Sequence, residues 1–95
     1  MINKATTIFD SELTGTNVSA GIDIPSVTNY IVISSKRDKA IWLCDALGDK
    51  QVMLPNHDEV NKHTYAKLEI SGCRIKLQAD ESASGKVYVM AFHGV

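Results

Sequence analysis

The amino-acid sequence predicts an all-β protein: a single antiparallel β-sandwich, jelly-roll or immunoglobulin-like, with about seven strands. Short runs rich in Val, Ile, Tyr and Leu recur from residue 18 onward, and turn-forming residues separate them. No apolar helical period is sustained for the length of a helix. With 95 residues, 44% of them hydrophobic, the chain suffices for one domain with a modest core.

The first residues of the chain differ from the rest. "MINKATTIFDSELTGTN" is rich in Thr, Ser and Asn and holds only scattered apolar residues. We expect residues 1–17 to form an extended N-terminal arm, with one short strand at 6–9, and residues 18–95 to form the sandwich domain. The arm is either a frayed terminus or a segment whose apolar side chains dock on a neighbouring subunit, namely Ile8, Phe9 and Leu13.

The strand-like runs follow in order, at residues 18–24, 30–35, 40–45, 51–54, 65–70, 73–79 and 86–92. Three of the separators predict hairpins. The charged "SKRDKA" is expected at a hairpin tip, and Ser71 and Gly72 are expected in a tight turn whose second residue tolerates positive φ. A polar turn that ends at Gly85 is expected to join the last two runs as a third hairpin.

The last two runs differ in how their apolar residues are distributed. "CRIKLQA" alternates, so we expect one buried face, made of Cys73, Ile75, Leu77 and Ala79. "KVYVMAF" is apolar on both faces, with Val87, Val89 and Ala91 on one side. Either this strand is covered on both sides, or its second face is kept for a partner. That second face is the candidate interface: Tyr88, Met90 and Phe92.

Two residue types in the apolar runs invite a chemical interpretation. Cys44 and Cys73 each lie in a strand-like stretch, and we expect both to be reduced, buried and inert. Trp42, the single tryptophan, is expected in the core. If it faced outward, it could stack on a sugar ring or anchor a protein interface.

No constellation of residues predicts catalysis or cofactor binding. None of the three histidines lies in a recognisable nucleophile context, and the chain has no glycine-rich phosphate loop. One loop gathers potential metal ligands, but their spacing does not match that of zinc sites: His57, Asp58, Glu59 and His63. We therefore expect a protein that is not an enzyme, with no catalytic residue, no metal and no cofactor.

Charge and hydropathy exclude two further classes of partner. Ten basic and eleven acidic residues give a net charge of −1, too balanced for the positive field that nucleic-acid binding needs. The longest apolar runs, such as "VYVMAF", are far shorter than a membrane-spanning helix. The start of the chain has no apolar segment of the secretory type. We expect neither nucleic acid nor membrane as a partner.

The order of features resembles that of small phage virion proteins. It is carried by the Thr- and Ser-rich start "TTIFDSELTGTNVSAGIDIP", the tryptophan strand "AIWLCD", and "YAKLEISGCRIKLQAD" leading through "ESASGKVYVMAF" to the end. Such proteins are β-sandwich subunits that decorate or cement capsids or serve as head-and-tail accessories. The resemblance covers most of the chain but includes no diagnostic motif and no site residues.

The resemblance implies a non-enzymatic structural protein of a phage particle, made in the host cytoplasm and located in the virion. Its partners would be other virion proteins, such as a major capsid or tail or neck protein, together with copies of itself. The alternative is a β-sandwich module that binds a small ligand or carbohydrate through Trp42 or Tyr65. A small protein that inhibits a host enzyme is a third possibility.

Overall fold

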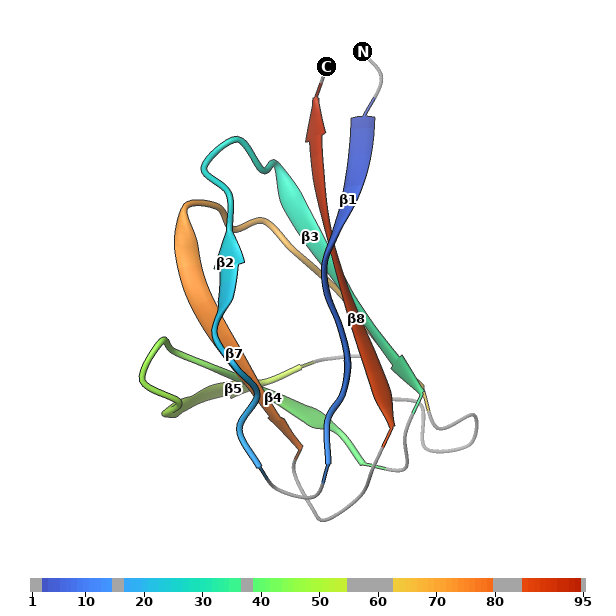
Figure 1. Cartoon of the computed structure of the whole chain (residues 1–95), viewed down its shortest axis with the longest axis vertical. Helices are drawn as coiled ribbons and strands as arrows, with labels where there is room; N and C mark the ends of the chain where they lie inside the picture. Colours follow the sequence, from blue (N-terminus) through green and yellow to red (C-terminus); the bar gives the residue numbers. More distant parts are fainter. Residues whose placement is uncertain (1–2, 15–16, 37–38, 55–62, 80–84, 95) are drawn as a thin grey trace.

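The computed structural model describes residues 3–14, 17–36, 39–54, 63–79 and 85–94, and it confirms the all-β sandwich. Within these residues, eight strands form two four-stranded antiparallel sheets that face each other (Figure 1). Sheet I has the order β1-β8-β3-β6, and sheet II has the order β2-β7-β4-β5. The strands are β1 (Asn3–Glu12), β2 (Ile22–Ile24), β3 (Tyr30–Lys36), β4 (Ile41–Cys44), β5 (Lys50–Met53), β6 (His63–Leu68), β7 (Cys73–Ala79) and β8 (Lys86–Gly94).

The strand order is that of a jelly roll, which decides between the two sandwich types expected. Among strands that follow one another in sequence, only β4 and β5 are hydrogen-bonded neighbours in the described structure. The three predicted hairpins are therefore wrong, because β3 and β4, β6 and β7, and β7 and β8 lie in different sheets. When the chain crosses between sheets, the apolar faces of successive strands meet in the core. A short polar link can make such a crossing as well as a hairpin within one sheet.

The link between β6 and β7 shows how such a crossing is held. The Gly72 amide donates to the Pro25 carbonyl at 3.3 Å, so the link lies against the segment that follows β2. Gly72 has a φ of 63°, which confirms the expectation of positive φ at this position even though the turn is not a hairpin.

The core fills the space between the two sheets. Alternate residues of β3, β6, β7 and β8 point inward, and those of the central strands β3 and β8 are fully buried or nearly so. Sheet II contributes a matching apolar layer from β2, β4 and β7. The buried hydrophobic residues are Leu13, Ile22, Ile24, Ile31, Ile33, Ile41, Cys44, Leu54, Ala66, Ile75, Leu77, Ala79, Val87, Val89 and Ala91.

The segment expected as an arm contains the edge strand of sheet I. β1 pairs with β8 from Asn3 opposite Gly94 to Glu12 opposite Lys86, so this strand is much longer than the short one expected. A bulge between Thr7 and Phe9 inserts one residue and places Phe9 opposite the buried Val89. Whether residues 1–17 act as a separable arm stays a prediction.

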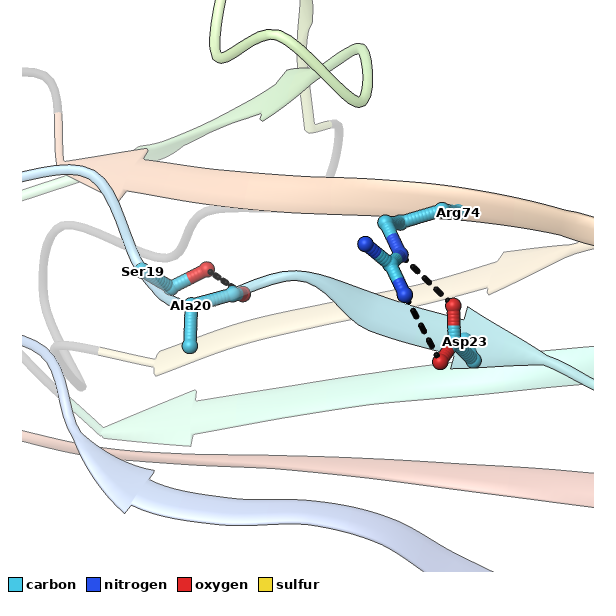
Figure 2. Close-up of polar contacts among 4 residues, drawn as sticks. All are labelled: Ser19, Ala20, Asp23 and Arg74. Carbon is cyan, nitrogen blue, oxygen red and sulfur yellow. Dashed lines mark hydrogen bonds and ion pairs between the residues drawn. The ribbon is translucent and has the colours of Figure 1, made fainter.

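Contacts with β7 attach β2, the edge strand of sheet II, and the segment before it (Figure 2). Arg74 donates to both carboxylate oxygens of Asp23 on β2, at 2.7 and 3.2 Å, and this hydrogen bonding holds the pKa of Asp23 below its ordinary value. Before β2, the Ser19 amide donates to the Leu77 carbonyl at 2.8 Å, and the Ser19 hydroxyl accepts from the Leu77 amide at 2.9 Å. The same hydroxyl donates to the Ala20 carbonyl. The segment around Ser19 is therefore tied to β7.

The two-sheet core predicts that substitution of an inward-facing residue lowers the free energy of unfolding much more than substitution of an exposed one. Ile33→Ala removes a fully buried side chain from a central strand, so the free energy of unfolding in urea should fall by about 2–5 kcal/mol. Val27→Ala, at a residue that is 67% exposed, is the control and should change it by less than about 0.5 kcal/mol. Equal effects would contradict this assignment of the core.

Candidate binding surfaces

The outer face of sheet I gathers all three tyrosines of the chain. Because β8 buries Val87, Val89 and Ala91, its other side chains point away from the core. The neighbouring strands β3 and β6 follow the same alternation. We call this surface the tyrosine face and define it by Tyr30, Val32, Tyr65, Tyr88, Met90 and Phe92.

Strand register arranges the tyrosine face in rows. Tyr88 lies opposite Ser34, which lies opposite Tyr65, so a small side chain separates two tyrosines that are 41% and 49% exposed. In the next row Met90 lies opposite Val32. Beyond it, Tyr30 and Phe92 meet edge to face, with ring centroids 4.9 Å apart.

Polar groups border the aromatic centre. The Lys67 ammonium lies 4.4 Å from the centroid of the Tyr30 ring. Lys86 donates to Asp10 of β1 at 3.2 Å, and this hydrogen bond raises the pKa of the lysine. The Ser34 hydroxyl and the His63 imidazole Nε2 are hydrogen-bonded at 3.1 Å. Charged and hydrogen-bonding groups therefore surround the aromatic centre of the tyrosine face.

The six residues predicted as an interface divide into two groups. Tyr88, Met90 and Phe92 lie together on the tyrosine face. Leu13 is buried in the core, and Ile8 and Phe9 are partly buried against it. The contact of these three with a partner stays a prediction. Tyr65 was named only as a stacking residue for a carbohydrate. Tyr30 and Val32 were missed, although the apolar run "YIVI" of β3 carries the same two-sided signal as β8.

Trp42 forms a second candidate surface, on the outer face of sheet II. The expectation that it lies in the core is wrong: Ile41 faces inward and is fully buried, so the next side chain of the strand faces outward. Trp42 is half-buried and pairs with Gln78 on one side and Met53 on the other, while Gln78 also pairs with Val18. We call Val18, Gln78, Trp42 and Met53 the tryptophan row.

The structure places both cysteines and one of the candidate metal ligands. Both cysteines are free thiols, as expected, and Cys44 is buried; burial raises the pKa of its thiol. The expectation for Cys73 is wrong, because this residue is exposed at the start of β7, at the margin of the core. Among the described residues, no cluster of three or more His, Cys, Asp and Glu could hold a metal ion. The loop residues His57, Asp58 and Glu59 lie outside the described part, and His63 is the first residue of β6.

The described residues include no helix that is long and apolar enough to cross a membrane.

Comparison with known proteins identifies the fold. No family model matches the chain, and no curated protein matches it either. Among solved structures, the SPBc2 prophage-derived protein YomS is similar, with 14% identity, coverage of 96% of this chain and 91% of that one, and a TM-score of 0.54. A mutant of a carbohydrate-binding module of family 29 is similar at 9% identity, with coverage of 98% and 94% and a TM-score of 0.52. At these identities the likeness shows the sandwich fold.

The two thiols should differ in reactivity in the native protein. The exposed Cys73 should react quickly with a disulfide reagent such as Ellman's reagent, and Cys44 should react only in denaturant, because it is buried and its thiol is held protonated. Absorbance of the released thiolate, compared between Cys73→Ser and Cys44→Ser, measures each site. Fast native reaction of Cys44 would contradict its burial.

Proposed function

We propose that the chain is a non-enzymatic structural protein of a phage particle, which attaches to another particle protein through the tyrosine face. The observation that carries the proposal is the gathering of all three tyrosines with Phe92 and Met90 on one outer sheet face. Tyrosine, phenylalanine and methionine are the residue types enriched at the centres of protein interfaces.

The geometry of the tyrosine face suits docking of a protein surface. The aromatic side chains stand on β3, β6 and β8, so the sandwich holds them in place before binding. Tyr65 and Tyr88 stand on either side of Ser34, whose hydroxyl is hydrogen-bonded to the His63 imidazole, so polar groups that can bond to a partner lie beside the aromatic rings. Lys67, Lys86 and Asp10 at the rim supply charges that fix orientation.

A phage particle is the setting that best accommodates a small binding domain of this kind. The similar fold of a prophage-derived protein supports this setting. In a particle, many copies of one docking site are repeated, and any self-association between attached subunits adds avidity to a modest single contact.

A carbohydrate-binding module is the second candidate. The outward position of Trp42 favours it, since an aromatic ring on a flat sheet face can stack on a sugar ring. The similar fold of a carbohydrate-binding module supports this reading as well.

The attachment proposal predicts the behaviour of particles purified from the host. The chain should be present in them by mass spectrometry, and Tyr88→Ala should lower the amount bound about tenfold or more, as loss of an interface tyrosine does. Val52→Ala, at an exposed residue of β5 in the other sheet, is the matched control and should bind like the unaltered chain.

Two outcomes would contradict the proposal. The chain could be absent from purified particles, or Tyr88→Ala could be retained as well as Val52→Ala. Circular dichroism of both variants would show that each is folded.

A further inference from the structure

We propose that two copies of this chain pack their tyrosine faces against each other, about a twofold axis that crosses the strands of sheet I. The inference rests on the proposed use of the tyrosine face as a protein interface. It names a second copy as the partner that covers this face in the free protein. A particle protein that docks on the same face would replace that copy.

The outer face of sheet I carries as many acidic residues as lysines. Outward and inward residues alternate along β3 and β6, and the alternation continues past β6, because Leu68 and Ile70 both pack against the core. Glu69 therefore lies on the outer face. Among the described residues, this face carries the following acids and lysines: Asp10, Glu12, Lys36, Lys67, Glu69 and Lys86. Such a balance selects neither a strongly acidic nor a strongly basic partner.

Four of these six charged residues are matched within the chain. Lys86 donates to Asp10 at 3.2 Å and lies opposite Glu12 on the neighbouring strand. The Lys67 ammonium lies over the Tyr30 ring. These four groups are already occupied, so the contact between copies does not depend on them.

Lys36 and Glu69 are the other two charged residues, and they lie at opposite ends of the face. Within the described residues, neither has an ion pair or a hydrogen bond through its side chain. Lys36 ends β3 opposite His63, whereas Glu69 follows the other end of β6, in line with Tyr30. Six residues along the strands separate the two ends, which is about 20 Å. The two charges therefore cannot meet within one chain.

A twofold axis across the middle of the face brings these two charges together. The axis runs between the row of Tyr88 and the row of Met90, so each of these rows lies over the other row of the second copy. Tyr88, which is 41% exposed, then contacts Met90 of the second copy. Lys36 lies over the end where the second copy holds Glu69. Packed sheets lie about 10 Å apart, a gap that a lysine and a glutamate span together.

The direction of the axis keeps like charges apart. With the axis across the strands, the end of the face that holds Lys36 and Lys86 lies over Phe92 of the second copy, and the lysine stems can pack beside its ring. An axis along the strands would instead place Lys86 over Lys36 of the second copy. Each favourable contact also occurs twice, as a twofold interface requires.

The area of the face determines how strong the pairing is. Four strands about 4.8 Å apart and four outward rows about 6.8 Å apart cover about 500 Å² of each copy. A total of about 1,000 Å² lies at the small end of specific interfaces. We therefore expect a reversible dimer that forms at micromolar concentrations.

Charge reversals test this arrangement by sedimentation velocity across a wide range of concentration. The unaltered chain should change from monomer to dimer. Lys36→Glu and Glu69→Lys should each weaken the dimer at least about tenfold, because each places like charges together at two symmetric contacts. Lys50→Glu makes the same change of charge on β5 of sheet II, so it is the matched control and should dimerise like the unaltered chain.

An equimolar mixture of the two charge-reversed chains tests the pairing directly. In a mixed dimer, each of the two contacts again joins a lysine to a glutamate, so dimerisation should return although each chain alone stays monomeric. The double variant Lys36→Glu with Glu69→Lys should dimerise by itself for the same reason. Circular dichroism of every variant checks that it is folded.

The outcomes separate this inference from the proposed function. A monomer at every concentration would overturn the inference and leave particle attachment, which is measured on purified particles, as it stands. A dimer that resists both reversals, or a mixture that stays monomeric, would overturn the twofold pairing of the tyrosine faces. A larger oligomer would overturn the closed pair. Dimerisation as expected, with the chain absent from particles, would overturn attachment and support this inference.

Discussion

The pairing of β8 with both β1 and β3 is the constraint on which the rest of the structure depends. Its inward residues Val87 and Val89 are fully buried, and burial of one such side chain stabilises the fold by about 1.5–3 kcal/mol. Without β8, β1 would lose its partner strand in sheet I and the core would open on one side. The same strand carries Tyr88 and Met90 outward, so a rigid core and a candidate binding surface share one backbone.

Period-two alternation made much of the fold predictable. It assigned the inward residues of β7 and β8 correctly at Ile75, Leu77, Val87 and Val89, because a strand with one buried face leaves a direct mark on the sequence. The partner of each strand could not be predicted in the same way. A link such as Ser71 and Gly72 has the composition of a turn whether the chain reverses within a sheet or crosses to the other one.

The candidate surfaces were predicted in part, again from the alternation of side chains along the strands. The two-sided apolar pattern of "KVYVMAF" identified Tyr88, Met90 and Phe92, because apolar residues on the second face of a strand need a separate explanation. Trp42 was misplaced because residue type was given more weight than the alternation with Ile41. Burial of Phe9 depends on the bulge in β1, and a one-residue shift of this kind leaves no signal in composition.

Because β1 and β8 are adjacent, this domain is suited to circular permutation. Asn3 pairs with Gly94, so the first and last strands start and finish at the same corner of sheet I (Figure 1). A short linker could join these ends, and the chain could be reopened at the exposed turn around Leu47 with every strand pairing retained. The same corner would accept insertion of the whole domain into a loop of a host scaffold, and both candidate surfaces would remain on its two broad sides.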